Sequence, residues 1–308
     1  MKLRIGTRKS PLAMWQAHRA QNLLENNGYE TELVPISSEG DLRLSQPIYE
    51  LGITGVFTKT LDIALVNDQI DVAVHSLKDV PTQLANGLHL TACLPRGDNR
   101  DIFVIKSDDF FKKKNRTIAT GSLRRRAFWL HQFPDDQLVD LRGNVQLRIQ
   151  KLIDNDWDAA IFAYAGLDRS DILESLETRG LTYHFLPEMV SAPSQGIVGL
   201  VAREDLDLSH ISHEISEKAA RIERSFLRKL QGGCTAPIGG FAKPLEDGRI
   251  NFHGVVLSLN GKQRIEVQQI AEVTNPVAFG IEMAEICIEQ GAAKMIQEIK
   301  KELNSEKN

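Results

Sequence analysis

The sequence predicts an α/β protein with two mixed-sheet domains and a smaller third domain of the α+β class. At 308 residues the chain exceeds the size at which one hydrophobic core stops growing, roughly 250–300 residues. Short apolar runs alternate with helical patterns through the first two thirds, which is typical of doubly wound sheets. In the last third, the pairs Asp247-Gly248 and Asn260-Gly261 separate runs of alternating hydrophobicity, and such pairs favour antiparallel hairpins.

The first domain opens with a strand, helix, strand unit. Residues 2–7 and 31–34 are the predicted strands. Between them, Ser10 supplies an N-cap hydroxyl and Pro11 is favoured at the first helical position. The turn that carries Arg8 therefore follows a strand and precedes a helix, where free backbone amides favour an anion.

The stretch 71–81, DVAVHSLKDVP, is a buried strand that ends in polar residues. His75, Ser76, Lys78 and Asp79 stand at its carboxyl end, and ligands of open α/β sheets bind outside the carboxyl ends of strands. The segment is therefore a candidate site for chemistry. The alternative is an ordinary transition from strand to loop with solvated charges.

The rest of the first domain contains one long loop and two further elements. Residues 37–55 are rich in glycine and polar side chains, and their length indicates a functional loop. Leu61 and Leu65 recur at helical spacing, and 88–94 is a predicted strand. Gly97 then marks a candidate hinge.

A second alternating region begins at Asp101 and predicts the second sheet domain. Its strands are predicted in DIFVIKS, TIAT, LVDL and AAIFAYAG, with helices around Phe128 and from Val145. Between Lys112 and Lys151 there are ten Lys and Arg against three Asp, a local net charge of +7. Residues 191–202 are interpreted as strand and as the return of the chain to the first domain.

The third domain is predicted to begin with a helix over 211–231 that stops at Gly232 and Gly233. The hairpins form a three-stranded antiparallel sheet, and a helical stretch over 276–303, interrupted near Gly291, covers one face. The predicted boundaries are 1–95 with 192–212 for the first domain, 98–190 for the second and 214–308 for the third. Two crossings between the sheet domains predict a hinged cleft like that of periplasmic binding proteins.

Composition excludes several classes of protein. A net charge of −4 argues against a general nucleic-acid binder. No apolar stretch is long enough for a membrane span and the N-terminus lacks a signal-peptide core, so we expect a cytoplasmic protein. Three widely spaced cysteines suit a reducing compartment. No metal site is expected, because His210 and His213 are more simply explained as a solvated helix face.

Two sets of arginines follow predicted strands and open predicted helices. Arg124, Arg125 and Arg126 form the first set, and Arg142 with Arg148 the second. Guanidinium groups bind carboxylates or phosphates bidentately, so the two sets together predict a polyanion site at one rim of the second sheet. A solvated basic helix face is the alternative, although Arg142 stands at a turn.

Cys234 differs from the other two cysteines because it lies in a loop of glycine, threonine and proline. No helix or central strand would tolerate that sequence, so the thiol is predicted to be exposed and able to act as a nucleophile or attachment point. The alternative is a loop cysteine without a role.

Taken together, these segments resemble the porphobilinogen deaminase (hydroxymethylbilane synthase) family over nearly the whole chain. The motifs that carry the resemblance are GTRKSPLAMWQA, GVFTKTLDIAL, DVAVHSLKDVP, ATGSLRR, LRGNVQLR, AGLDR, SQG and LQGGCTAPIG. The resemblance implies a dipyrromethane cofactor bound to Cys234 through a thioether, and a catalytic Asp79 with Lys78 beside it. It implies further cofactor contacts at Ser76, Lys78, Asp79, Ser122, Arg124, Arg125, Arg142 and Gly143. The implied substrate contacts are Arg8, Ser10, Gln16, Arg148, Arg169, Gln195 and Gly196.

The implied activity is that of a transferase of tetrapyrrole and haem biosynthesis, which joins four porphobilinogen molecules to the covalent primer and releases ammonia and linear hydroxymethylbilane. Positive charge develops on a pyrrole nitrogen during each condensation, and a carboxylate at Asp79 would stabilise that charge. Each ring also brings two carboxylates, which the arginines would bind. We expect a monomer without nucleic acid, membrane or obligate protein partner.

Four positions depart from the commonest family pattern: Glu50, Thr54, Gly121 and Ser194. The first two lie in the 37–55 loop, where lysines are common. The main rival interpretation is a non-catalytic, hinged receptor for small anions, which would have no need of Cys234.

Overall fold

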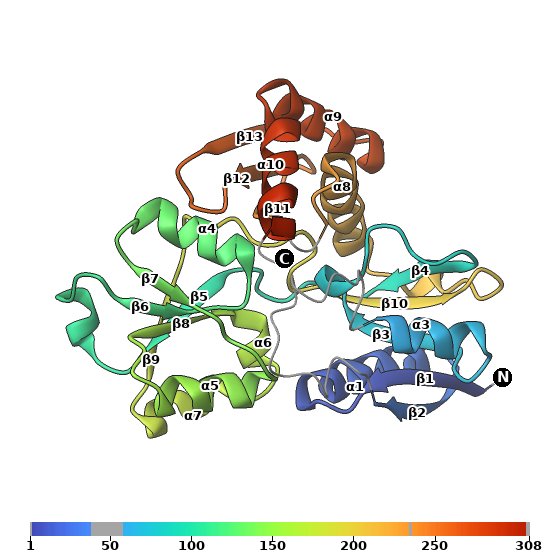
Figure 1. The fold of residues 1–308 in the computed structure, drawn as a ribbon. Helices are drawn as coiled ribbons and strands as arrows, with labels where there is room; N and C mark the ends of the chain where they lie inside the picture. Colours follow the sequence, from blue (N-terminus) through green and yellow to red (C-terminus); the bar gives the residue numbers. More distant parts are fainter. Residues whose placement is uncertain (1, 38–57, 234–235, 306–308) are drawn as a thin grey trace.

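The computed structural model describes residues 2–37, 58–233 and 236–305, and these form two five-stranded sheets and one three-stranded sheet (Figure 1). Each sheet has its own buried core, and the three units surround the centre of the molecule. The polar ends of the first two sheets therefore come near one another and near the third unit.

The first sheet is mixed, with the strand order β2-β1-β3-β10-β4. The strands β1, β2 and β3 are parallel, whereas β10 runs antiparallel to β3 and β4. Its elements are β1 (Lys2–Arg8), α1 (Pro11–Asn26), β2 (Glu30–Ile36), α3 (Lys59–Val66), β3 (Val72–Ser76), β4 (Leu88–Cys93) and β10 (Val198–Arg203). In the sequence, all strands of the second sheet lie between β4 and β10. The chain therefore crosses between the two sheets twice.

The second sheet repeats this plan with the order β7-β6-β8-β5-β9. The strands β6, β7 and β8 are parallel, and β5 is antiparallel to both neighbours. Its elements are β5 (Asp101–Ile105), β6 (Thr117–Ala119), α4 (Leu123–Gln132), β7 (Gln137–Val139), α5 (Val145–Asp154), β8 (Ala159–Ala163), α6 (Tyr164–Asp168), α7 (Leu173–Leu176) and β9 (Thr182–Phe185). The start of β5 consequently lies at the same sheet edge as the carboxyl ends of β6 and β8.

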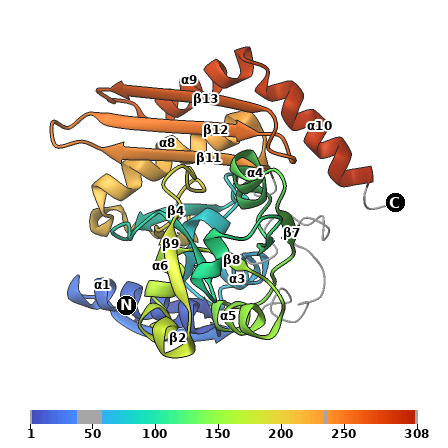
Figure 2. The same ribbon diagram turned by 90° about the vertical axis from the view of Figure 1, so that its left-hand side faces the viewer.

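The third unit is an antiparallel sheet with helices packed against it (Figure 2). Both predicted hairpins form, each at the expected pair of turn residues. The elements are α8 (Glu214–Leu230), β11 (Ile238–Pro244), β12 (Ile250–Leu257), β13 (Arg264–Ala271), α9 (Pro276–Glu289) and α10 (Ala292–Ser305). Phe226 of α8 and Phe252 of β12 meet in this core, and Val255 and Leu257 pack with Phe128 of α4.

Three of the predicted elements were wrong in detail. Residues 191–197 form a loop, because Ser194 and Gly196 have positive φ angles and their backbone groups bond outside any strand ladder. The helix predicted over 211–231 begins at Glu214, since Ser209–Ile211 form a separate 3-10 turn. The run AAIFAYAG is strand only to Ala163, and α6 follows at once.

Hydrogen bonds join the two crossing segments to each other. The backbone nitrogen of Gly97 donates to the carbonyl oxygen of Gly196 at 3.0 Å, and Arg96 Nε donates to the carbonyl oxygen of Gln195, also at 3.0 Å. The Arg96 guanidinium continues to Glu223 of α8 with both terminal nitrogens, at 2.8 and 2.6 Å. The candidate hinge is thus bonded both to the second crossing and to α8 of the third unit.

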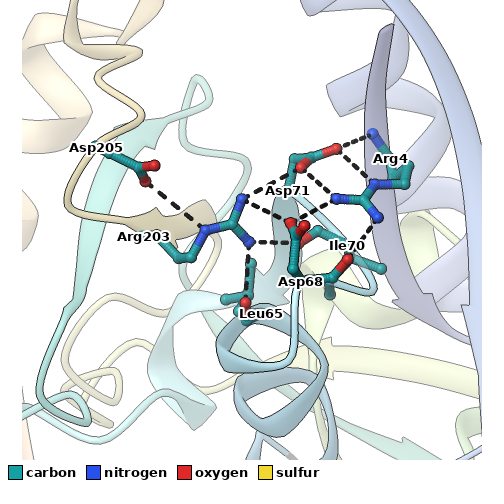
Figure 3. Close-up of polar contacts among 7 residues, drawn as sticks. All are labelled: Arg4, Leu65, Asp68, Ile70, Asp71, Arg203 and Asp205. Carbon is teal, nitrogen blue, oxygen red and sulfur yellow. Dashed lines mark hydrogen bonds and ion pairs between the residues drawn. The ribbon is translucent and has the colours of Figure 1, made fainter.

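A charged network fixes the end of β3 that lies away from Ser76 (Figure 3). Asp71 is 5% exposed and accepts from the backbone nitrogen, Nε and a terminal nitrogen of Arg4, at 2.8 to 2.9 Å. Arg203 approaches the same carboxylate at 3.4 Å and donates to the carbonyl oxygen of Ile70. These bonds tie β1, β3 and β10 together.

We expect Asp71→Asn to lower the free energy of unfolding by about 2 kcal/mol at pH 7, with the difference disappearing in acid. Hydrogen bonds from Arg4 outweigh burial and lower the pKa of Asp71 to about 2 from 3.8. Because the folded pKa is depressed, this stabilisation is present above pH 4 and is lost as the pH falls from 4 to 2. Urea unfolding of the wild type and of Asp71→Asn at pH 7 and pH 3 measures this difference in the free energy of unfolding. Asp205→Asn, at an exposed pair, is the control and should change stability by less than about 0.5 kcal/mol.

Candidate active site

The turn after β3 carries Lys78 and Asp79. Leu77 is fully buried and its backbone nitrogen donates to the carbonyl oxygen of Ile197 at 2.9 Å, which fixes the start of the turn against the second crossing. Asp79 is exposed and Lys78 is half-buried. Enough protein surrounds the ammonium that loss of hydration lowers the pKa of Lys78 to about 8, although the Asp79 carboxylate opposes this shift. Lys78 is thereby able to gain or lose a proton near neutral pH.

Gln195 links this turn to the second sheet. Lys78 Nζ donates to Gln195 Oε1 at 3.2 Å, and Gln195 Nε2 donates to Asp101 Oδ1 at 3.1 Å and to the carbonyl oxygen of Asn99 at 2.7 Å. Gln195 is 1% exposed, so it is held between the two sheets. The turn on the first sheet and the start of β5 on the second are therefore one connected polar network.

Asp101 is the buried anion to which two of the predicted arginines bind. It is fully buried, and it accepts from a terminal nitrogen of Arg124 at 2.7 Å and from Arg125 at 2.8 to 3.0 Å. Burial alone would raise the pKa of Asp101, but Arg124, Arg125 and Lys78 together hold that pKa below its ordinary value. The carboxylate is therefore charged and keeps both guanidiniums in place.

The two predicted arginine sets meet at this edge of the second sheet. Burial, followed by the charges of Arg125 and Arg142, lowers the pKa of Arg148 to about 10, and Asp79 and Arg8 of the first unit also act on Arg148. The Asp79 carboxylate of the first unit is therefore within electrostatic reach of Arg148 on the second sheet. Arg126 is the exception, because it pairs with Asp140 at 3.3 Å in a half-exposed position.

The first turn of the chain supplies a third group of residues. Ser10 is the N-cap of α1 and accepts from the backbone nitrogen of Ala13 at 3.3 Å. Gln16, which is buried, donates to Ser76 Oγ at 2.7 Å. Burial and, to a lesser extent, the charge of Arg8 lower the pKa of His75 to about 4.

Three predicted contacts sit at positions with a clear backbone role. Ser122 caps α4 by accepting from the backbone nitrogen of Arg125 at 3.5 Å. Gly143 has a φ of 116°, and a Cβ there would lie 2.5 Å from the Leu147 side chain. Gly196 has a φ of 87°, and a Cβ there would lie 2.7 Å from the carbonyl oxygen of Gly97. Only glycine fits the last two positions.

Arg169 lies between the first helix and the second crossing. Its terminal nitrogen donates to the carbonyl oxygen of Gly196 at 2.7 Å, and its guanidinium carbon is 5.0 Å from the centre of the Trp15 ring. Burial lowers the pKa of Arg169. The side chain is 9% exposed, so in this conformation it joins the two sheet units.

The two described departures from the family pattern have physical consequences. At Gly121 a Cβ would lie 2.6 Å from the carbonyl oxygen of Leu141, so serine would require the backbone to shift. Ser194 is fully buried with a φ of 66°, and its hydroxyl has no hydrogen-bond partner among the described residues.

We expect Ser194→Gly to raise the free energy of unfolding by about 1–2 kcal/mol. The change removes left-handed backbone strain of about 1–2 kcal/mol and an unsatisfied hydroxyl, offset by about 0.5–1 kcal/mol of added chain entropy. Ser194→Ala removes only the hydroxyl, so its free energy of unfolding should rise by less than that of Ser194→Gly. Thermal unfolding measures both, and a lower midpoint for Ser194→Gly would contradict this account.

Several predicted features lie outside the described residues: Cys234, Glu50, Thr54 and nearly all of the 37–55 loop. The other two cysteines are described. Cys93 of β4 and Cys287 of α9 are fully buried, and burial raises the pKa of each thiol to about 12. Neither is suited to attack or to carry a bound group.

Among the described residues, no cluster of three or more His, Cys, Asp or Glu is arranged to hold a metal ion. His213 caps α8 by accepting from the backbone nitrogen of Ser216 at 3.3 Å, and His210 lies 3.4 Å from the Tyr29 hydroxyl. No helix in the described part of the chain is both long and apolar enough to cross a membrane.

Sequence reasoning missed Asp101 and Glu223 as parts of this region. Asp101 opens a strand whose residues are all buried, and Glu223 lies on the apolar face of α8 between Ala219 and Phe226. A charged residue within an apolar pattern is rarely buried unless it is paired. That signal was present in the sequence for both residues.

We expect Asp101→Asn to destabilise the protein by about 3–5 kcal/mol, because it leaves two buried guanidiniums without their counter-charge. Urea unfolding at pH 7 measures the effect. Asp109→Asn is the control, since Asp109 and its partner Lys112 are both about four-fifths exposed. If Asp101→Asn lowers the free energy of unfolding no more than this control does, Arg124 and Arg125 do not need Asp101 as their counter-charge.

Comparison with known proteins assigns the chain to a family. Residues 3–210 match the model described as porphobilinogen deaminase, dipyromethane cofactor binding domain, and residues 218–289 match the porphobilinogen deaminase C-terminal domain. The chain belongs to the porphobilinogen deaminase family. Among relatives of that name, a protein of Chlorobium phaeobacteroides is 38% identical over 97% of this chain and 98% of its own length. The porphobilinogen deaminase of a Nitratiruptor species is 39% identical over 96% of each chain.

Among solved structures, the VFT2 domain of Bordetella pertussis BvgS, as a double mutant, is similar at a TM-score of 0.44 and 12% identity. The match covers 70% of this chain and 87% of that one. This likeness is too weak to support a conclusion about the porphobilinogen deaminase site.

The residues present suit the cofactor for which the porphobilinogen deaminase model is named. A dipyrromethane carries two carboxylates on each ring, and the cations at this edge outnumber the carboxylates Asp79 and Asp101. Arg124 is 5% exposed, and its Nε has no hydrogen-bond partner among the described residues. A buried donor of this kind is costly unless a further acceptor reaches it.

Proposed function

We propose that the protein is a hydroxymethylbilane synthase, which condenses four porphobilinogen molecules head to tail and releases ammonia and linear hydroxymethylbilane. The observation that carries this proposal is the position of the Lys78–Asp79 turn of the first sheet, which is joined through Gln195 and Asp101 to Arg124 and Arg125 of the second. A carboxylate and a surplus of guanidiniums in one region suit a reaction that makes a cationic pyrrole from a substrate with two carboxylates.

We assign the arginines to the acidic side chains of the substrate and cofactor. Charge-assisted bonds of this type contribute on the order of 1.5–3 kcal/mol each, so several together hold a growing polyanion. Arg8, Arg142 and Arg148 belong to this set, and Arg125 shares its charge with Asp101. Asp101 thereby orients guanidiniums without neutralising the whole region.

Asp79 and Lys78 carry the proton chemistry in this proposal. The Asp79 carboxylate stabilises positive charge on the pyrrole nitrogen as ammonia leaves porphobilinogen and as the next bond forms. Since the pKa of Lys78 is lowered to about 8, a fraction of its amine is neutral at physiological pH and can exchange a proton with the departing amine. Gln195 holds Lys78 in reach of Asp79.

The proposed cofactor is a dipyrromethane joined to Cys234 by a thioether. When bound, it supplies the pyrrole carbon to which the first substrate ring is joined. Arg124, Arg125, Arg142 and the Ser76–Asp79 turn would hold its side chains. The burial of Cys93 and Cys287 supports Cys234 as the attachment point, because both other thiols are inaccessible.

We further propose that the enzyme works as a cytoplasmic monomer without an obligate partner. Two buried free thiols suit a reducing compartment. The proposed domains are residues 1–95 with 192–212, residues 98–190 and residues 214–308.

An intact mass spectrum of the purified protein, followed by incubation with porphobilinogen, tests the function. The expected mass exceeds that of the bare chain by two linked pyrrole rings, and ammonia is released in a ratio of four per hydroxymethylbilane. A receptor for small anions would bind porphobilinogen without releasing ammonia. A bare-chain mass that persists after incubation would refute the enzyme.

A further inference from the structure

Arg224 of α8 holds the turn that carries Lys78 and Asp79. One terminal nitrogen donates to the carbonyl oxygen of Val80 at 3.0 Å and lies 3.4 Å from that of Leu77, and the other donates to the carbonyl oxygen of Pro81 at 2.6 Å. One guanidinium from the third unit thus contacts the backbone before and after Asp79.

The bond from Leu77 to Ile197 fixes the start of the turn, and Arg224 binds the segment that leaves it. The turn is a single 3-10 turn, Leu77–Asp79, closed by one hydrogen bond from the backbone nitrogen of Val80 to the carbonyl oxygen of Leu77 at 3.2 Å, and the carbonyl groups of Val80 and Pro81 follow it. Pro81 follows and has no backbone N–H to donate. A cation is the natural partner for such an end, both as a donor and as a charge near partly negative carbonyls.

The orientation of Asp79 depends on this backbone. Across residues 2–37, 58–233 and 236–305 we find no hydrogen bond to the Asp79 carboxylate, and its side chain is exposed. Lys78, by contrast, is held by Gln195. Movement of the turn would therefore displace the Asp79 carboxylate, which has no side-chain bond of its own in the described part of the chain to hold it.

We propose that Arg224 is a positioning residue for the condensation reaction, acting through the backbone of the Leu77–Pro81 turn to aim Asp79. The inference rests on the proposed function, since it names how the same site is held. Glu223 precedes Arg224 in α8 and accepts from Arg96 and from the backbone nitrogen of Ser194, each at 2.6 Å. Two consecutive residues of α8 therefore hold two segments: Glu223 holds the crossings, and Arg224 holds the turn that carries Asp79. The helix that precedes the Cys234 loop in the sequence is thus also the support of the Asp79 turn.

This role differs in its kinetics from that of an arginine that binds substrate carboxylates. Asp79 serves every condensation, so a displaced turn should slow all four steps by a similar factor and lower kcat. Loss of a carboxylate-binding arginine should instead raise KM or stall the chain at one length.

The test compares Arg224→Met and Arg224→Lys with Arg228→Met in the holoenzyme. Arg228 is exposed one turn further along α8, so its replacement is a matched loss of charge on the same helix. We measure kcat and KM for porphobilinogen, the masses of enzyme intermediates in single-turnover mixtures, and the thermal midpoint.

We expect Arg224→Met to lower kcat by about 10²-fold, since misplacement by about 1 Å has that effect, with KM changed less than about twofold. All intermediates should appear more slowly in unchanged proportions, and the cofactor mass should remain. Arg224→Lys should recover part of the rate, because one ammonium can bond to fewer of the carbonyls. Arg228→Met should behave as wild type.

Wild-type kcat in Arg224→Met, or a stall at one intermediate, would overturn the positioning role while leaving the enzyme assignment intact. If Arg224→Met does not fold, Arg224→Lys decides: a lower kcat at unchanged KM supports the inference, and a wild-type kcat refutes it. A wild-type protein that releases no ammonia from porphobilinogen would instead refute the proposed function and this inference with it.

Discussion

Asp79→Ala should lower the turnover of porphobilinogen by about 10²–10⁴-fold while leaving the fold intact. The substitution removes a carboxylate whose charge acts on both Arg148 and Lys78. The fold should survive because Asp79 is exposed and the turn is held by backbone bonds from Leu77 and to Arg224. Steady-state release of ammonia measures turnover, and circular dichroism and the thermal midpoint report the fold.

Asp79→Asn separates charge from shape in the same experiment. It keeps the size of the side chain and should lose nearly as much activity as Asp79→Ala, because the amide cannot balance a cationic pyrrole. Asp205→Ala, at an exposed position after β10, is the control for the loss of a surface carboxylate. Activity near that of wild type in Asp79→Asn would remove Asp79 from its catalytic role.

Cys234→Ser should yield a protein whose intact mass is that of the bare chain and which releases no hydroxymethylbilane. A serine hydroxyl is far less nucleophilic than a thiol at neutral pH, so the proposed thioether cannot form. Intact mass spectrometry before and after incubation with porphobilinogen gives the result directly.

Cys93→Ser and Cys287→Ser are the matched controls for that experiment. Both thiols are buried and burial raises their pKa to about 12, so both variants should keep the added mass, although each also places a hydroxyl in a core. Loss of the added mass in a folded Cys93→Ser protein, with its retention in Cys234→Ser, would move the attachment point.

Much of the fold could be predicted because its signals are local. The helix start at Ser10 and Pro11 is confirmed, as are both hairpin turns and the break between α9 and α10 near Gly291. Each of these depends on a few consecutive residues whose φ preferences and hydrogen bonds are set by residue type. The prediction failed at 191–197, where Ser194 takes a left-handed conformation because Glu223, remote in the sequence, accepts its N–H.

From the sequence we could propose a set of candidate site residues, but not the network of bonds that joins some of them. The resemblance implies that Asp79, Lys78 and the arginines act in the same reaction. In the structure, Lys78 is within electrostatic reach of Arg124 and Arg125, and Asp79 of Arg148. The resemblance could not show that Arg124 and Arg125 are bound to Asp101, or that Gln195 spans the two sheet units.

By itself the sequence determined the order of strands and helices, the family, and the types of side chain available for the reaction, because these follow from short patterns along the chain. Only the tertiary structure decided which charges meet. Asp101 and Gln195 are 94 residues apart, and Arg224 reaches Val80 across 144 residues, so these bonds exist only once three units have packed together. Their strength depends on burial, which residue type does not fix.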